Sequence, residues 1–251
     1  MLVIFPIYNR VRLLPFFLRY YSSLGATRFV CALYNGERNP LYEQILPFES
    51  RYNLSIEEST RDRHLPQYSA VAEGHGLNRI REAFSKNESW YCIADLDEFY
   101  FFGGRNLSDL VYELERKGYD AAHGIFFDRI AADGTFPEIG NSLDDTFPLA
   151  CDLTHCAGLC NRKITIARSA LDITPGHHDA RGKILFHAAE VHHFKWHKGV
   201  RENVTLALKH LTQQGFRTPV KQMPHLLKLI DKQIDIQNPK LRTRIASKLG
   251  I

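Results

Sequence analysis

Apolar and polar positions follow two different periods along the first half of the chain. Short apolar runs predict buried strands at residues 2–7, 28–34, 52–57 and 90–95. The stretches between them, with apolar residues three or four apart or with Pro in a first turn, predict helices at residues 11–24, 40–48 and 70–84. Strands that alternate with helices indicate an α/β fold with a mostly parallel central sheet.

The second half of the chain continues this pattern and then becomes helical. Asn106 or Ser108 can cap a helix that ends at Lys117, because Gly118 follows it. Further strands are predicted at residues 119–127, 162–167 and 191–196. Beyond Gly199 the spacing is helical, with interruptions expected at Pro219, Pro224 and Pro239. We predict one domain over residues 1–216 and a basic helical extension over residues 217–251.

Composition and charge narrow the possible functions. With 251 residues, 44% of them hydrophobic, the chain can form a substantial core. The whole chain has a net charge of +4, but residues 217–251 alone carry +6, so the remaining residues carry −2. The main part of the chain therefore does not resemble a nucleic-acid-binding surface. No apolar run approaches the roughly 20 residues that cross a bilayer. The five cysteines fit reduced thiols, and we expect a cytoplasmic protein.

The most specific chemical signal is the sequence Asp95-Leu96-Asp97-Glu98-Phe99, directly after an apolar strand. In an extended segment Asp95 and Asp97 project to the same side, so their carboxylates would repel unless a cation held them. Mg²⁺ or Mn²⁺ is the natural partner, with water and phosphate oxygens completing its shell. Open α/β sheets also bind their ligands beyond the carboxyl ends of the strands.

At these residues the chain resembles glycosyltransferases with the GT-A fold, in particular a bacterial branch of glycosyltransferase family 2. That branch carries Asp-x-Asp-Glu-Phe and, in its C-terminal half, His-Phe-Lys-Trp. The matching segments here are Asp95 to Phe99, Phe127 to Gly134, Thr146 to Pro148, Gly176 to His178 and His193 to Trp196. The resemblance runs from about Leu2 to Gly199. It departs at Asn9-Arg10, where such enzymes often have Asn-Glu, and at Tyr34-Asn35-Gly36, where an Asp-rich turn is usual.

The resemblance implies a Rossmann-like nucleotide-binding half and transfer of a sugar from a nucleotide-diphosphate donor to a hydroxyl acceptor, with inversion. The acceptor would be a glycan or a lipid-linked sugar in the synthesis of a surface polysaccharide or glycoconjugate. Mn²⁺ or Mg²⁺ would bind Asp95 and Asp97, and His193 matches the C-terminal histidine that often serves as third ligand. Donor-binding candidates are Asn9, Asn35, Arg79, Asp95 and Lys195.

The acceptor hydroxyl needs a general base. Asp144 and Asp145 are the leading candidates, because they lie in a loop between the metal strand and the C-terminal motif; Asp128 and Asp179 remain open. On a single strand through residues 191–196, His193 and Lys195 would share one side, so that Lys195 could hold a phosphate.

Several alternatives stay open. One is a metal-dependent phosphoesterase or nucleotidyltransferase, although Asn9-Arg10 does not begin a Gly-rich phosphate loop. Another is a non-catalytic nucleotide- or carbohydrate-binding protein on the same fold. A structural zinc site is conceivable at Cys151, His155, Cys156 and Cys160, without the usual paired spacing. The apolar stripe at Met223, Leu226, Leu227, Ile230 and Ile234 either packs on the body or lies on anionic lipid at the inner face of the membrane.

Overall fold

The computed structural model describes residues 1–7, 11–34, 36–59, 70–84, 86, 88–213, 215 and 217–251. The chain divides into two compact units. Unit 1 comprises Met1–Pro66, Ala70–Ile125 and Arg162–Val191, and unit 2 comprises Gln67–Ser69, Phe126–Asn161 and His192–Ile251. The predicted boundary after residue 216 falls inside unit 2 and stays a prediction.

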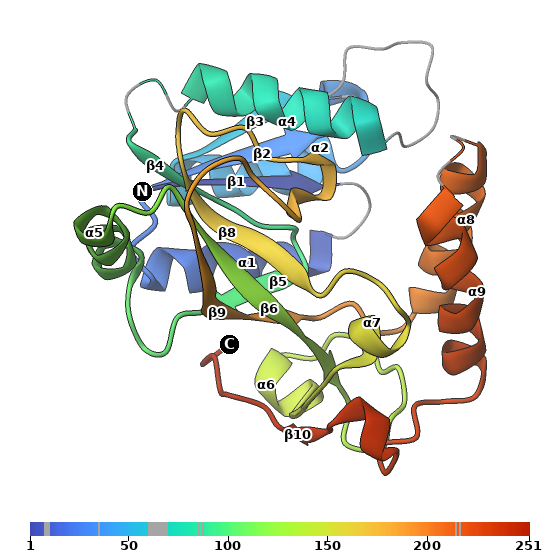
Figure 1. Ribbon diagram of the computed structural model, residues 1–251. Helices are drawn as coiled ribbons and strands as arrows, with labels where there is room; N and C mark the ends of the chain where they lie inside the picture. The colour runs from blue at the N-terminus through green and yellow to red at the C-terminus, as the bar shows by residue number, and fades with distance from the viewer. Residues whose placement is uncertain are drawn as a thin grey trace. The chain divides into compact units, whose positions relative to one another are not determined.

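A block of four parallel strands forms the centre of unit 1, in the order β4-β1-β2-β3. The strands are β1 (Leu2–Ile7), β2 (Arg28–Leu33), β3 (Leu54–Glu58) and β4 (Trp90–Ile93). The main helices that connect them are α1 (Leu14–Ser23) and α4 (Ala70–Phe84), and between β2 and β3 lie α2 (Tyr42–Ile45) and α3 (Glu49–Tyr52). Most of these elements lie where the hydrophobic pattern predicts them, which confirms an α/β fold with a Rossmann-like half (Figure 1). Helix α3 was not predicted, and it occupies Tyr52, so β3 begins two residues later than expected.

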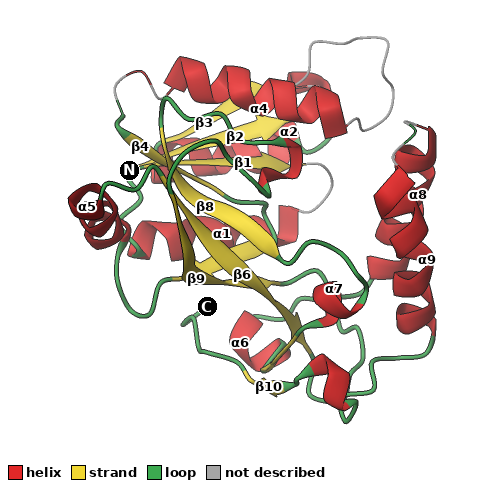
Figure 2. Ribbon diagram, viewed as in Figure 1, coloured by secondary structure: helices red, strands yellow, loops and turns green. Residues whose placement is uncertain are grey.

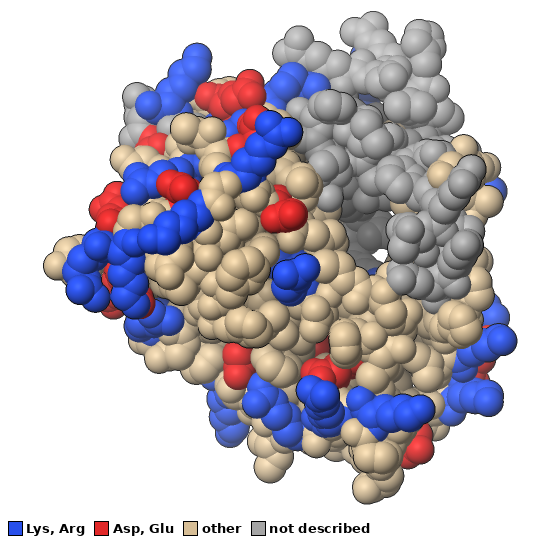
Figure 3. All heavy atoms as spheres, viewed as in Figure 1, with Lys and Arg blue, Asp and Glu red and all other residues tan. Residues whose placement is uncertain are grey.

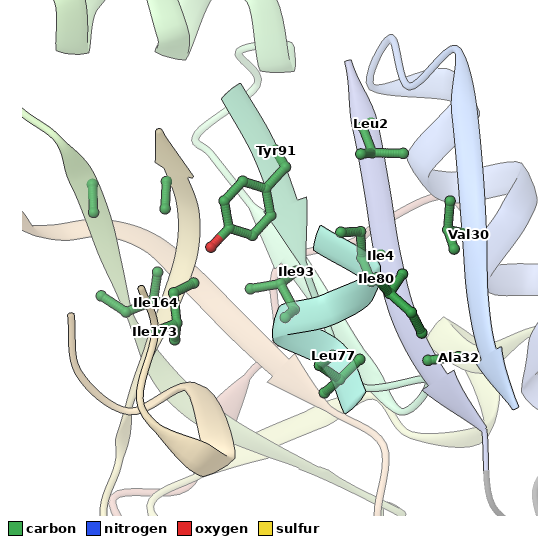
Figure 4. Close-up of a cluster of buried hydrophobic side chains, with 12 residues drawn as sticks. Leu2, Ile4, Val30, Ala32, Leu77, Ile80, Tyr91, Ile93, Ile164 and Ile173 are labelled. Carbon is green, nitrogen blue, oxygen red and sulfur yellow. The ribbon is translucent and has the colours of Figure 1, made fainter. Parts of the chain in front are cut away.

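Helices cover both faces of this block, as the unbroken burial of β1 requires (Figure 2). On one face Leu2 and Ile4 join a buried cluster with Leu77 and Ile80 of α4 (Figure 4). On the other face Phe5 packs against Phe17 of α1, with ring centroids 4.8 Å apart. Successive residues of a strand point to opposite faces, so a strand covered on both faces is apolar at every position.

Further strands extend the sheet of unit 1, and β8 (Arg162–Arg168) is antiparallel to both β4 and β6 (Ala121–Ile130). β8 pairs with β4, residues 121–125 of β6 pair with β8, and β5 (Glu98–Phe101) pairs with β9 (Ile184–His193). Helix α5 (Leu107–Lys117) begins with the Asn106 side chain accepting a hydrogen bond from the Asp109 N–H, and Gly118 ends it in a left-handed conformation. Both ends of this helix are as predicted.

Unit 2 contains the remaining strand pairs and the C-terminal helices. Residues 128–130 of β6 pair with β7 (Leu149–Cys151), which pairs with β10 (Arg244–Ile245). The helices are α6 (Leu143–Thr146), α7 (Leu153–Cys156), α8 (Val200–Gln213) and α9 (Arg217–Asp231). Helices α8 and α9 pack against each other (Figure 1). A buried apolar cluster that includes Ile130, Trp196, Leu226 and Ile230 forms the core of this unit.

Two predictions about the C-terminal region were wrong. The last long strand ends at His193, so Phe194, Lys195 and Trp196 follow it without strand structure. Pro224 does not interrupt a helix but lies inside α9. Met223, Leu226 and Ile230 of α9 are buried, and this packing offsets the hydrogen bond that Pro224 cannot donate. The packing accounts for the apolar stripe within unit 2, while contact with lipid remains untested.

Basic and acidic side chains are interspersed on the face drawn in Figure 3, without one large area of a single sign. None of the helices within the described residues is both long and apolar enough to cross a membrane.

Candidate functional site

Asp95 and Asp97 lie in a tight turn directly after β4 in unit 1. The turn is closed by the Glu98 N–H, which donates to the Asp95 carbonyl over 2.9 Å, and Leu96 is buried. The extended geometry assumed from the sequence was therefore wrong, because the strand already ends at Ile93. The turn nevertheless follows the carboxyl end of a strand in the parallel block, the edge at which α/β sheets bind ligands.

Lys163 of β8 lies between two of the acidic side chains of this turn. Its ammonium donates to Asp95 Oδ2 over 2.6 Å and to Glu98 Oε1 over 2.8 Å. Lys163 and Glu98 are 3% and 2% exposed, whereas Asp95 is 36% exposed. The Tyr100 hydroxyl lies 3.1 Å from Glu98 Oε2, which also accepts the Asp95 N–H. Glu98 is thus a buried structural carboxylate, and Asp95 is the acidic group of this pair that solvent reaches.

The protonation states follow from these contacts. Burial disfavours the charged form of Asp95, but the Lys163 ammonium outweighs it and holds the pKa of Asp95 well below its usual value. Burial likewise disfavours the Lys163 cation, and Asp95 and Glu98 together raise the pKa of Lys163 above its usual value. Asp95 and Lys163 are therefore charged at neutral pH, and the Lys163 ammonium contacts two carboxylate side chains, those of Asp95 and Glu98.

His177 approaches the same turn from the 3₁₀ segment Pro175–His177 in unit 1. Its Nδ1 lies 4.0 Å from Asp95 Oδ1, too far for a hydrogen bond. The residue is 4% exposed, and among the described residues Nδ1 has no hydrogen-bond partner. Burial and the nearby Lys163 charge lower the pKa of His177 to about 3, so the ring is neutral at physiological pH. The unit 1 site therefore combines an accessible carboxylate with a buried neutral imidazole.

A second polar cluster, in unit 2, is built around Asp128 on β6. Asp128 is fully buried and accepts hydrogen bonds from the Thr154 N–H at 2.5 Å, the Thr154 hydroxyl at 2.8 Å and Trp196 Nε1 at 2.7 Å. His193 Nδ1 lies 3.1 Å from Asp128 Oδ1. Burial opposes the charge, yet the bond from His193 and the other donors keep the pKa of Asp128 below its usual value.

This arrangement defines the roles of Asp128 and His193. Asp128 is enclosed by donors and out of reach of solvent, which disfavours it as the general base. As a hydrogen-bond acceptor at Nδ1 it instead selects the His193 tautomer with the proton on Nδ1, so that Nε2 carries the lone pair. His193 belongs to unit 2, while Asp95 and Asp97 belong to unit 1, and a metal shared by the three stays a prediction.

The two leading base candidates differ in their surroundings. Asp144 is bound by the buried guanidinium of Arg129 at 3.0 Å. Its second oxygen accepts N–H groups of Leu249 at 2.8 Å and Gly250 at 2.7 Å. Asp145 is exposed in the first turn of α6, where its N–H donates to the Ser142 hydroxyl. Asp144 thus tethers the segment 249–250, and of the two only Asp145 presents its carboxylate to solvent.

The remaining predicted residues lie as follows. Arg79 is exposed on α4 and donates to the Ser59 carbonyl over 3.1 Å, so it links α4 to the end of β3. Lys195 lies in unit 2, two residues beyond the end of β9. Asn9 and Asn35 lie outside the described residues.

Within the described part of the chain, no group of three or more His, Cys, Asp and Glu side chains could hold a metal ion. Cys151 is buried and Cys156 and Cys160 are exposed, all as free thiols, and the Cys156 thiol contacts the Lys240 carbonyl.

No protein-family model and no curated protein matches the chain. Among solved structures it is similar to HddC from Yersinia pseudotuberculosis, at 10% identity and a TM-score of 0.38, over 80% of this chain and 96% of that one. It is also similar to a UDP-glucose pyrophosphorylase complexed with UDP-glucose, at 9% identity and a TM-score of 0.30, over 66% of this chain and 73% of that one. Both TM-scores are below 0.5.

Sequence reasoning missed two functional-site residues and underused a third. Lys163 looked like an ordinary residue at the start of a strand, and Glu98 like one more acid of the turn. A lysine within an otherwise apolar strand, Lys163-Ile-Thr-Ile-Ala, was the available signal, because a buried lysine requires a carboxylate partner. His177 was noted within Gly176-His177-His178 but had no assigned role.

Proposed function

We propose that this protein is a glycosyltransferase that moves a sugar from a nucleotide-diphosphate donor to a hydroxyl acceptor with inversion. The observation that carries the proposal is the position of Asp95 and Asp97 in the turn after β4, beside a parallel block with a Rossmann-like arrangement. Asp95 is ionised and 36% exposed there, as a ligand of a divalent cation must be. The motif resemblance described above supplies the reaction class.

The proposed roles follow from the surroundings of each residue. Asp95 and Asp97 hold the divalent cation, Mn²⁺ or Mg²⁺, which when bound neutralises charge on the diphosphate leaving group. Lys163 and Glu98 fix the Asp95 carboxylate in position, because both are buried and bonded to the same turn. Lys195 is the candidate for a phosphate contact.

Asp145 is the proposed general base, since its carboxylate is exposed while Asp144 is occupied by Arg129 and backbone N–H groups. His193, oriented by Asp128, is the C-terminal ligand that the motif resemblance implies. A glycan or lipid-linked acceptor and a cytoplasmic location are part of the same proposal.

Sugar transfer should be measured directly by mass spectrometry. The full chain is incubated with a panel of nucleotide-diphosphate sugars and candidate acceptors, with Mn²⁺ or Mg²⁺. We expect transfer from one donor class, and we expect Asp97→Asn to abolish it without changing the unfolding temperature. Asp109→Asn is the matched control, because Asp109 is exposed on α5 in the same unit, away from the turn.

The outcomes separate the proposal from its alternatives. Release of phosphate or pyrophosphate without sugar transfer would favour the phosphoesterase or nucleotidyltransferase. Binding of a nucleotide sugar without turnover would favour a binding protein. Full activity in Asp97→Asn would refute the assignment of this turn as the active site.

A further inference from the structure

The His177 imidazole has a position in unit 1 that its packing does not explain. It is 4% exposed, yet within the described residues its Nδ1 forms no hydrogen bond. A buried polar atom without a partner costs about 1–3 kcal/mol. The neighbouring His178, by contrast, places its Nδ1 2.7 Å from the Arg162 carbonyl oxygen. Asp95 Oδ1 lies 4.0 Å from His177 Nδ1.

This spacing fits a cation held by both atoms. Metal–nitrogen and metal–oxygen bonds of about 2.0–2.2 Å allow one ion to reach two ligand atoms at this separation. The other oxygen of Asp95 is taken by Lys163, so Oδ1 is the oxygen that turns toward His177. Two carboxylates, those of Asp95 and Glu98, contact the one ammonium of Lys163.

We propose that His177 binds, together with Asp95, the divalent cation of this site and makes the site prefer a first-row transition ion such as Mn²⁺ over Mg²⁺. A site made only of carboxylates and water suits Mg²⁺, whereas an imidazole ligand favours transition ions. Two protein ligands are sufficient when water and phosphate oxygens complete the shell. The inference rests on the proposed function in using the same turn, and it decides between the two cations left open by the sequence.

The test measures metal binding by the full chain, without any sugar nucleotide. Mn²⁺ is added alone and then with inorganic pyrophosphate, and pulsed electron paramagnetic resonance detects nitrogen bound to the ion. Competition with Mg²⁺ gives the ratio of the two dissociation constants. His177 has a φ of 58°, a conformation that Asn tolerates, so His177→Asn removes the imidazole with little strain. We expect this variant to lose the nitrogen signal and at least about tenfold of the preference for Mn²⁺.

Two further variants make the result specific. His178→Asn is the matched control, and it should keep both the nitrogen signal and the preference, because that ring is bound to the Arg162 carbonyl. His193→Asn tests the ligand predicted from the sequence. The inference is overturned if the nitrogen signal persists in His177→Asn, if it disappears in His193→Asn instead, or if the wild-type protein shows no nitrogen-bound Mn²⁺ in either condition.

Failure of this inference is distinguishable from failure of the proposed function. Nitrogen-bound Mn²⁺ that depends on His177, in a protein that transfers no sugar, would uphold the metal ligand and reject the transferase. Sugar transfer that depends on Asp97, with no nitrogen bound to the metal, would uphold the transferase and reject His177 as a metal ligand.

Discussion

Replacing Lys163 with Met should destabilise the protein strongly, because the buried Glu98 carboxylate then has no ammonium beside it. Met keeps the apolar stem of the side chain and removes the ammonium. Glu98, 2% exposed, then loses the cation at 2.8 Å and keeps its contacts with the Tyr100 hydroxyl and the Asp95 N–H. Asp95 is 36% exposed, so water screens its charge and we assign the cost to Glu98 alone.

Breaking a buried pair by removing one partner costs about 3–5 kcal/mol. For a chain of this size that corresponds to a fall in unfolding temperature of roughly 6–20 °C. The free energy of unfolding is measured by urea titration, followed by circular dichroism and by tryptophan fluorescence. Trp90 lies in unit 1 and Trp196 in unit 2, so the fluorescence signal reports on both units.

Two controls define the cause of the loss. Lys198→Met removes a lysine that is 71% exposed and paired with Glu138, so it should change the unfolding free energy by less than about 0.5 kcal/mol. Lys163→Met combined with Glu98→Gln removes the stranded charge and should recover at least about half of the lost stability. A loss below about 1 kcal/mol in Lys163→Met, or a double variant no more stable than the single one, would refute the reasoning.

Two further predictions concern Asp128 and His123. In the wild type the Asp128 carboxylate accepts hydrogen bonds from several donors, and Asp128→Asn places an amide N–H₂ opposite some of them. Urea titration should therefore show a loss of about 1–3 kcal/mol in the free energy of unfolding, and an unchanged value would contradict these contacts. His123 is 2% exposed, and its burial together with the nearby Arg162 charge lowers its pKa in the folded protein. As the pH falls, the histidine of the unfolded chain therefore binds a proton before that of the folded chain, and the free energy of unfolding decreases as the pH drops through about 6.5. His123→Leu should therefore lose less unfolding temperature between pH 7.5 and pH 5 than the wild type, and equal losses would count against this explanation.

Elements whose signals are local were predictable from the sequence. Helix α5 has its cap at Asn106 and its end at Gly118, and β1 is apolar throughout because helices cover both of its faces. Prediction failed where packing overrides local preference. Pro224 is accommodated inside α9 because Leu226 and Ile230 are buried, and β9 ends at His193 although the apolar pattern continues to Trp196.

In the candidate site, too, the residues with a local signal were predictable from the sequence and the distant partner was not. Asp95 and Asp97 could be found from the sequence, since their acidic pattern after an apolar strand is contained in five consecutive residues. Their partner Lys163 lies 68 positions from Asp95 along the chain and meets it because β8 pairs with β4. No local pattern predicts such a pairing.

The sequence by itself determined that this is an α/β protein with a group of carboxylates after a central strand, because periodicity and composition are properties of neighbouring residues. Only the tertiary structure decided which of the acids are available for chemistry. Glu98, Asp128 and Asp144 are held by buried donors, while Asp95 remains accessible beside His177. The physical reason is that burial and ion pairing depend on contacts between distant segments, and those contacts exist only in the folded chain.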